Sequence, residues 1–555
     1  MGKKRIFSFI SLIKKNIVEI LFFLVGIVFF IPIVVLTLKD LRPPHWDMAR
    51  HLWNSAFYYD YLRGFLKNGI FNGHTDLVRF LSDYRYYPPF LYYVTIPFYV
   101  IFGLSVKAAL ISNVFWVFLL GIGFYFGSKK YFNNTLVGLL AFSFFLFCPF
   151  TLGQSMEYQI DFPLSAVFIA FLATIPFTEK LQNLGVSFLL GFLFGLGMIT
   201  KWTFVLLSFA PLVLFFSDSL IEIARSKDKT QAMNFVRNFF AFVLASIFAM
   251  WSWYFSNYPI IKIDLTKNGV DQARLEGDPY GLNVESFTIY LWYLVRYQLY
   301  LPFFIFLLLG IFLLIKNKKV STPLSLFLIF ISIYIIFSYL PNKDARYTYP
   351  YVSILGLIFA CGICELKRKK IRNIAIILFY FISFLNLLFS RVPILKRGED
   401  LSLDIGKKSY KKIVLASSTS YTYHPGNLKN SFLFDDIFGV LENLESQNDA
   451  SESLKVSVFS CDNRYFNFWN FTQEARFRHL KIDFSFNPEN INRADAVILV
   501  LGGNSDLESK VVGLVGKKDK NLEEIFSKSF DSYDCTREES DFDCLSGKTV
   551  TIYKL

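Results

Sequence analysis

Long apolar stretches separated by short polar segments dominate the first 390 residues of the chain. Eleven of them match the length of a helix that crosses the hydrocarbon core of a bilayer, or nearly do. We predict spans near residues 17–38, 106–127, 134–152, 161–178, 184–199, 203–217, 238–258, 300–315, 322–340, 350–364 and 373–390. The pattern predicts an α-helical polytopic membrane protein and excludes an ordinary soluble enzyme.

A further apolar segment at residues 88–103 is too short for an ordinary span. As a helix it would extend about 24 Å, against a hydrocarbon core of roughly 30 Å. Counting it as a span would place Lys129-Lys130 and the later basic clusters on the outer side, against the positive-inside rule. We therefore predict a re-entrant or interfacial helix here. The N-terminus is then cytoplasmic and the region after the last span is external.

The pattern changes near residue 391, where the apolar runs shorten. Four runs have the length and composition of β-strands, at 411–415, 454–459, 494–501 and 549–553. We predict a transmembrane domain at 1–390 and an external α/β domain at 391–555. Cys535 and Cys544 could form a disulfide in an oxidising exterior or remain two thiols, and the sequence favours neither.

Composition supports the membrane assignment and narrows the partners. Hydrophobic residues make up 54% of the chain, and the net charge is +13. The lysines and arginines lie mainly in clusters between apolar runs, so membrane topology explains the charge and a nucleic-acid partner is not needed. None of the six cysteines forms a paired zinc-ligand pattern.

The first external loop, about 39–87, is long and carries two candidates for chemistry. Asp47 follows the first span closely, and partial desolvation near the membrane surface can adapt a carboxylate to act as a base. An exposed loop aspartate explains its position equally well. Arg85 begins the stretch Arg85-Tyr86-Tyr87-Pro88 at the level of a lipid phosphate, whereas tyrosines at that depth are ordinary.

Three later loops add charged residues on the same side. Glu157 and Asp161 lie at the outer end of two predicted spans, and their spacing puts them on one helical face if the turn is helical. Helix capping is the competing role for Asp161. Lys201 interrupts two apolar runs and could simply snorkel, and Arg346 offers a planar fork for phosphate oxygens or merely marks a loop. All these candidates fall on one face of the membrane, which suits a substrate with a phosphate at the headgroup level.

The arrangement resembles the GT-C superfamily of glycosyltransferases over about residues 17–390. Within it, the chain is similar to glycosyltransferase family 39, the group of protein O-mannosyltransferases and lipid A aminoarabinose transferases. The family's early external Asp matches Asp47, although its usual acidic neighbour is here Met48. Its Pro-Pro, Thr-Lys-aromatic and Arg-Tyr-x-x-Pro elements match Tyr87-Pro88-Pro89, Thr200-Lys201-Trp202 and Arg346-Tyr347-Thr348-Tyr349-Pro350.

The resemblance implies an inverting transfer of a sugar from a polyprenyl-phosphate carrier to an acceptor hydroxyl at the external face. Asp47 would be the general base, and Glu157 or Asp161 would bind the sugar or the acceptor. By their position we assign Arg85, Lys201 and Arg346 to the donor phosphate, and we place Tyr347 with them in the donor-binding group.

Such a displacement needs no redox cofactor, and the chain has no Walker-type phosphate loop. We predict no metal site, although a divalent cation near Asp47, Glu157 and Asp161 is left open. The expected partners are the lipid-linked donor, membrane lipids and a lipid, glycan or protein acceptor. The resemblance also implies the plasma (inner) membrane of a bacterium.

Three other functions compete with this interpretation. A lipid-linked oligosaccharide polymerase or ligase would use diphosphate-linked donors, and the sequence separates it from a family 39 enzyme only through the early Asp47 loop. A flippase or transporter of lipid-linked saccharides should place functional charges at mid-membrane and on both faces. A receptor needs far fewer than eleven spans for anchoring.

Overall fold

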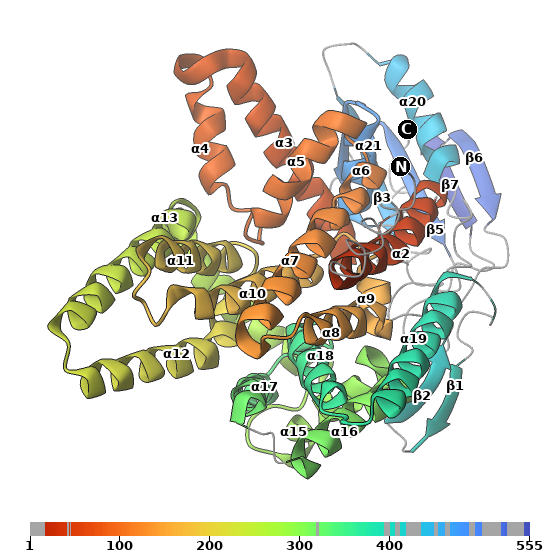
Figure 1. Ribbon diagram of the computed structural model, residues 1–555. Helices are drawn as coiled ribbons and strands as arrows, with labels where there is room; N and C mark the ends of the chain where they lie inside the picture. The colour runs from red at the N-terminus through yellow and green to blue at the C-terminus, as the bar shows by residue number, and fades with distance from the viewer. Residues whose placement is uncertain are drawn as a thin grey trace, which may run out of the picture.

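The computed structural model describes residues 17–40, 44, 46–317, 321–392, 394, 400–405, 411–417, 434–448, 453–460, 467–487, 494–501, 523–529 and 549–554. Most of the chain up to residue 392 is helical, and a mixed α/β region follows (Figure 1). Cys535 and Cys544 lie outside the described residues, so their disulfide stays a prediction.

The helices follow one another with short connections. Their bounds are α2 (Ile17–Lys39), α3 (Trp46–Asn72), α4 (His74–Ser82), α5 (Phe90–Phe102), α6 (Val106–Ile111), α7 (Asn113–Phe132), α8 (Thr135–Phe147), α9 (Pro149–Gln154), α10 (Asp161–Thr174), η1 (Ile175–Thr178), α11 (Leu184–Met198), α12 (Phe204–Ser226), α13 (Lys229–Thr266), η2 (Lys267–Asp271), α14 (Gln272–Glu276), α15 (Val284–Tyr293), η3 (Leu294–Gln298), α16 (Tyr300–Lys316), α17 (Ser321–Tyr339), α18 (Tyr349–Cys364) and α19 (Lys369–Arg391).

The protein is an integral membrane protein with several candidate spans. Each of the eleven predicted segments is helical in the structure. Within the described residues, six helices are long and apolar enough to cross a bilayer, and a seventh span results if the pair 284–298 and 300–316, bent by 115°, is counted as one. The remaining apolar helices have 10–17 residues, and the segment predicted to be re-entrant or interfacial is one of them, α5. The exact number of spans therefore stays a prediction.

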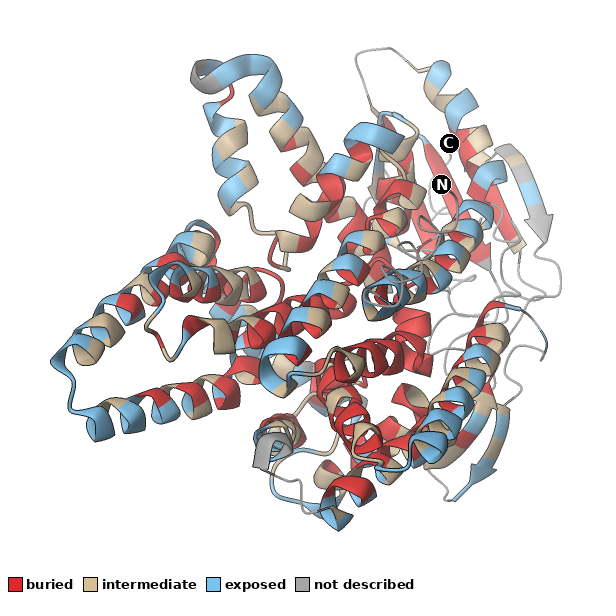
Figure 2. Cartoon of the chain, viewed as in Figure 1, coloured by how far each residue is buried: buried red, intermediate tan, exposed pale blue. Residues whose placement is uncertain are grey.

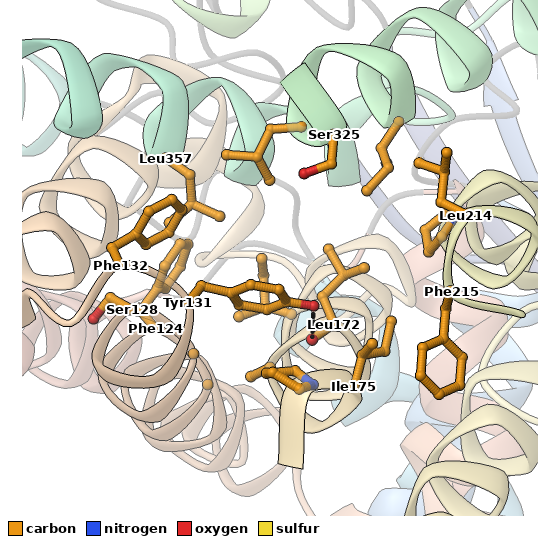
Figure 3. A pocket seen from close by; sticks show the side chains of 18 of the residues that line it. Phe124, Ser128, Tyr131, Phe132, Leu172, Ile175, Leu214, Phe215, Ser325 and Leu357 are labelled. Carbon is orange, nitrogen blue, oxygen red and sulfur yellow. Dashed lines mark hydrogen bonds between the residues drawn. The ribbon is translucent and has the colours of Figure 1, made fainter. Parts of the chain in front are cut away.

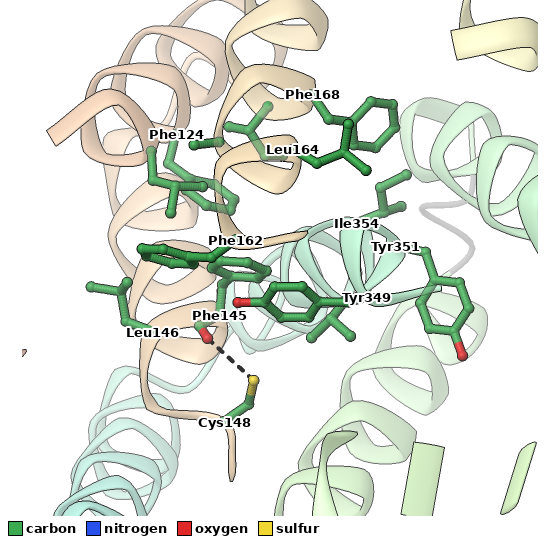
Figure 4. Packing of buried hydrophobic residues seen from close by; sticks show 14 of the residues in the cluster. Phe124, Phe145, Leu146, Cys148, Phe162, Leu164, Phe168, Tyr349, Tyr351 and Ile354 are labelled. Atoms are coloured by element: carbon green, nitrogen blue, oxygen red, sulfur yellow. Dashed lines mark hydrogen bonds between the residues drawn. The ribbon is translucent and has the colours of Figure 1, made fainter. Parts of the chain in front are cut away.

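The centre of the bundle is formed by α8, α10 and α18, which are buried along almost their whole length (Figure 2). Aromatic rings fill the space between them (Figure 4). Phe145 stacks on Tyr349 with ring centroids 5.2 Å apart, and the Tyr349 hydroxyl forms a 2.8 Å hydrogen bond with that of Thr151. Helices α16 and α18 approach so closely that a Cβ on Gly362 would overlap the carbonyl oxygen of Gly310. Small residues allow such backbone contact between membrane helices.

The peripheral helices show the opposite pattern. In the most apolar 18-residue stretches of α2, α13 and α19, only 22–28% of the residues are buried. Large apolar side chains such as Phe23, Phe248 and Phe381 face outward. Exposed apolar surface of this extent is stable in contact with lipid rather than water. Burial therefore separates a protein-facing core from a lipid-facing shell.

The C-terminal region contains two separate sheets. Strands β1 (Asp400–Asp404) and β2 (Lys412–Ser417) pair antiparallel, and β2 packs against α16, η3 and α19. The second sheet has the order β4-β3-β5-β7-β6 and consists of β3 (Leu454–Ser460), β4 (Ile482–Ser485), β5 (Ala496–Leu501), β6 (Glu523–Ser529) and β7 (Thr549–Lys554).

In that larger sheet β4, β3 and β5 are parallel, and β7 runs antiparallel to both of its neighbours. Helices α20 (Phe434–Ser446) and α21 (Phe468–Phe477) contribute Phe438 and Phe471 to an apolar core of its own. The four predicted strands are confirmed. The sequence pattern did not reveal that the first of them packs on the membrane helices instead of joining the larger sheet.

Candidate active site

Five segments from the four loops predicted to carry chemistry meet at one end of the bundle, which we call the site end. They surround a cavity of about 440 Å³. The loops contribute the start of α3, the Tyr86-Tyr87 turn, the start of α10, the segment 201–203 and the segment 340–347. Below them the first turn of α12 and the last turns of α17 supply apolar walls. The cavity therefore joins charged side chains to an apolar base.

Asp47 lies in the first turn of α3, where the helix dipole favours a negative charge. Its Oδ2 accepts a hydrogen bond of 3.1 Å from Nη1 of Arg346, and its Oδ1 lies 4.0 Å from Nη1 of Arg50. Burial acts to raise the pKa of Asp47, but Arg346 together with His51 and Arg50 lowers that pKa to about 2. Burial also lowers the pKa of His51 to about 3, so this imidazole is neutral at pH 7. At that pH the two arginines are therefore the cations that keep Asp47 ionised.

Arg346 connects three of the loops. Its Nη1 donates to Asp47 and also, at 3.0 Å, to Oε1 of Gln159. Its Nε and Nη2 bind the carboxylate of Asp344, two residues away, at 2.8 and 2.7 Å. The planar guanidinium suits this arrangement, because its donors project in fixed directions. A phosphate that entered the cavity would meet a cation already held in place.

Lys201 and Asp161 form a buried ion pair with Nζ 2.7 Å from Oδ1. Their side chains are only 8% and 3% exposed, so Lys201 does not snorkel to solvent. The Lys201 ammonium also lies 4.7 Å from the centre of the Tyr347 ring. Asp161 follows the N-cap residue of α10, Ile160, and no side chain caps this helix end. The ion pair, and not helix capping, is therefore the role that the geometry gives to Asp161.

Two predicted site residues do not line the cavity. Arg85 forms an ion pair of 2.7 Å with Asp83, donates to the Tyr61 hydroxyl and lies over the Phe57 ring. Glu157 is 3% exposed, and its carbonyl oxygen accepts from Nδ2 of Asn113. The turn between α9 and α10 is not helical, so Glu157 and Asp161 do not share a helical face. Gln159 reaches Arg346 instead.

The structure adds residues that sequence reasoning missed. Asp264, near the end of α13, lines the cavity and accepts a hydrogen bond from the Tyr84 hydroxyl. It follows a long apolar helix, and no motif at that position marks it. Tyr86 and Trp202 were named in the sequence motifs without a site role, and both line the cavity, with ring centroids 6.0 Å apart. Aromatic faces of this kind are common in sites that bind sugar rings or cations.

No metal centre is formed by the described residues. In that part of the chain, no three His, Cys, Asp or Glu side chains come together in an arrangement that could hold an ion. Cys148, Cys361 and Cys364 have free thiols inside or beside the apolar bundle. Asp47 and Asp161 instead have arginine and lysine partners, which suits the binding of an anion.

A second cavity, of about 560 Å³, is lined by side chains shown in Figure 3. They include residues from the last turns of α7 and α10, and α10 begins at the site end with Asp161. We call this opposite end of the bundle the far end.

Helices α12 and α17 line both cavities. Val205 of α12 lines the site-end cavity and Leu214 lines the far-end cavity. At a rise of 1.5 Å per residue, these two positions are separated by roughly 13 Å along the helix. Apolar side chains such as Phe124, Tyr131 and Leu172 dominate the far-end cavity, and no predicted site residue reaches it.

Comparison with known proteins supports the fold. No protein-family model matches the chain, and no curated protein matches its sequence. Among solved structures, ArnT from Cupriavidus metallidurans in the apo state has a TM-score of 0.55 and 13% identity, and the match covers 96% of this chain and 97% of ArnT. ArnT bound to undecaprenyl phosphate has a TM-score of 0.54 and 12% identity over 97% and 98%. The chain has an ArnT-like fold.

A weaker similarity exists to the oligosaccharyltransferase AglB from Archaeoglobus fulgidus in complex with an inhibitory peptide and a dolichol-phosphate. Its TM-score is 0.47 with 11% identity, over 88% of this chain and 70% of AglB. The similarity to ArnT confirms the predicted fold, whereas membership of the GT-C superfamily stays a prediction. Assignment to family 39 stays a prediction.

Proposed function

We propose that this protein is a membrane glycosyltransferase that moves a sugar from a polyprenyl-phosphate donor to an acceptor hydroxyl. One observation carries the proposal: an ionised carboxylate, Asp47, shares a cavity with the cations Arg346 and Lys201 directly above apolar helix ends. The cations suit the phosphate of a lipid carrier, and the apolar base suits the start of its chain. The ArnT-like fold is compatible with this function and does not establish it.

In the proposed reaction, Asp47 accepts the proton of the acceptor hydroxyl as its oxygen attacks the anomeric carbon of the sugar. The bond from that carbon to the phosphate oxygen breaks on the opposite side, its electron pair stays with the polyprenyl phosphate, and the configuration inverts. Lys201 and Arg346, with Tyr347 beside them, stabilise the charge that develops on the leaving phosphate. We assign no direct contact to Arg85 or Glu157, and we assign the sugar or the acceptor to Asp161.

For Asp47 to act as the base in this scheme, its interaction with Arg346 has to weaken when the donor binds. A carboxylate with a pKa near 2 is a weak base for a hydroxyl, because proton transfer to it is strongly uphill. A donor phosphate competes with Asp47 for the Arg346 guanidinium. Binding of the donor should therefore raise the pKa of Asp47 toward the value that a general base needs.

We further propose that the site end faces the exterior of a bacterial plasma membrane and that the N-terminus is cytoplasmic. Lys129 and Lys130 lie in the last turn of α7 and Lys316 in that of α16, at the ends of these helices remote from the cavity. Basic residues concentrate on the cytoplasmic side of membrane proteins. Residues 1–390 would then form the catalytic domain, and residues 391–555 an external α/β domain.

The test is sugar release from a panel of synthetic polyprenyl-monophosphate sugars by the purified protein in detergent, with Asp47→Ala alongside. We expect transfer or slow donor hydrolysis by the wild type and loss of it in the variant, with unchanged expression and elution. A folded wild type that releases nothing from any monophosphate donor would overturn the proposal. Diphosphate-linked oligosaccharides and a flipping assay would then test the polymerase and transporter alternatives.

A further inference from the structure

Besides β2, which packs against α16, η3 and α19, helix α21 of the C-terminal region contacts the membrane part of the chain and packs against α3. Three guanidinium groups and three aromatic rings form a continuous row of contacts along this interface. We call the set the cation–aromatic column, and it consists of Arg50, Trp469, Trp53, Arg85, Phe57 and Arg476.

Only Trp469 and Arg476 of the column come from α21. The Trp469 ring lies 4.9 Å from that of Trp53, and the Arg476 guanidinium lies 3.7 Å from the centre of the Phe57 ring. Arg476 also forms an ion pair with Asp60 of α3. The two helices are therefore joined at two points, one near the start of α3 and one about two turns further along.

Near the start of α3, Arg50 contacts both Trp469 of α21 and Asp47 of the candidate active site. The Arg50 guanidinium lies between two rings, 5.0 Å from the centre of Tyr86 and 5.2 Å from that of Trp469. Its Nη1 lies 4.0 Å from Oδ1 of Asp47. Tyr86 belongs to the cavity wall, whereas Trp469 comes from a part of the chain more than 400 residues after Arg50.

Hydrogen bonds contribute little to holding Arg50 in this position. Its Nε is buried without a hydrogen-bond partner, as are Nε1 of Trp53, Oγ1 of Thr472 and both amide atoms of Gln473 along the same contact. Ring contacts and the electrostatic attraction of Asp47 therefore determine where the guanidinium lies. Removal of one of the two rings should free a side chain with many accessible rotamers.

Arg50 and Arg346 attract opposite oxygens of the same carboxylate, Oδ1 and Oδ2 of Asp47. A donor phosphate would compete for Arg346, because that side chain lines the cavity and Arg50 does not. Arg50 would then remain as the cation that holds Asp47 in place during transfer. Its position matters most in the donor-bound state.

We propose that Trp469 is a positioning residue for the transfer reaction, which acts by holding Arg50 against Asp47, so that the C-terminal α/β region completes the active site. This inference rests on the proposed function for its catalytic consequence. Its structural part, that Trp469 restrains Arg50, stands independently. Trp469 touches neither donor nor acceptor in this scheme.

The experiment compares Trp469→Ala with Trp469→Phe, which keeps a ring over Arg50, and with Asp60→Asn. The last variant weakens the same docking contact at the Arg476 point without touching Arg50. We expect Trp469→Ala to lower kcat about tenfold with the KM for the donor within twofold. Trp469→Phe should recover most of the rate, and Asp60→Asn should stay within twofold of the wild type. Equal losses in Trp469→Ala and Asp60→Asn would reduce the role of Trp469 to docking and overturn the proposal.

A second measurement does not depend on activity. Phenylglyoxal modifies arginine side chains, and mass spectrometry of peptides gives the rate at Arg50 in each variant. We expect labelling of Arg50 to be several-fold faster in Trp469→Ala than in the wild type or in Asp60→Asn. An unchanged rate would overturn the restraint of Arg50 by Trp469. If the wild type transferred no sugar, the proposed function would fail, whereas this labelling result would still decide whether Trp469 restrains Arg50.

Discussion

The site-end and far-end cavities share the helices α12 and α17, yet they differ in chemistry. The far-end cavity is the larger, about 560 Å³ against 440 Å³, and the charged pair in its lining, Lys180 with Asp218, is 39% and 64% exposed. The site-end cavity brings together five segments from four loops and holds two charged pairs, Asp47 with Arg346 and Asp161 with Lys201. Converging charges that the fold keeps out of bulk solvent indicate a site better than cavity size does.

The functional difference between the two cavities is tested most directly by removing one carboxylate from each. Asp47→Asn should lower kcat/KM for sugar transfer about 10²- to 10⁴-fold, the range for loss of a general base. Asp218→Asn at the far-end rim should change it by less than about twofold, since Asp218 is 64% exposed and only pairs with Lys180. Comparable losses in the two variants would remove the functional distinction between the cavities.

The ion pairs of the two ends should also differ in stability. Lys201→Met leaves Asp161 buried without its partner and should cost about 3–5 kcal/mol in the free energy of unfolding. Lys180→Met removes the exposed pairs with Asp218 and Glu222 and should cost at most about 1 kcal/mol. Thermal unfolding in detergent measures both. The double variant Lys201→Met/Asp161→Asn should regain much of the loss, and failure to do so would argue against an uncompensated buried charge.

The pH dependence of kcat/KM should change when a cation at the site end is removed and should stay the same when a cation at the far end is removed. Because the pKa of Asp47 is lowered to about 2, the carboxylate is ionised above that pH, and Asp47 should add no acid limb to kcat/KM between pH 4 and 7. Arg346→Gln removes the strongest cationic influence, so burial should raise the pKa of Asp47 and move an acid limb into this range. Profiles of the residual donor hydrolysis test this, with Arg225→Gln at the far end of α12 as the control. A flat profile for Arg346→Gln would contradict the assignment.

The smallest effect is expected from filling the far-end cavity. Leu214→Phe adds apolar volume to its wall and should stabilise the protein by about 0.5–1 kcal/mol if the ring fits. Transfer activity should stay within twofold. A large loss of activity would show that the far-end cavity takes part in the reaction, and that result would make the two regions functionally connected.

Much of the fold could be predicted because periodicity and run length are local properties. All eleven apolar segments are helices and all four predicted strands are present. The four loops with candidate residues could be assigned to one end of the bundle because helices that alternate in direction return the chain to the same side. Arg85 and Glu157 were chosen by the same reasoning and yet lie outside the cavity wall, since proximity to an interface does not determine which way a side chain points.

Sequence alone determined which segments are helical, where the chain changes from membrane helices to an α/β region, and which loops carry Asp47, Lys201 and Arg346. These features follow from hydrophobic pattern and charge placement along the chain. The tertiary structure alone decided that Arg346 binds Asp47, that Asp161 is buried against Lys201, and that Trp469 reaches Arg50. Such pairings join residues far apart in the chain, and packing of whole helices fixes them through the few orientations that bury apolar surface without leaving charges unpaired.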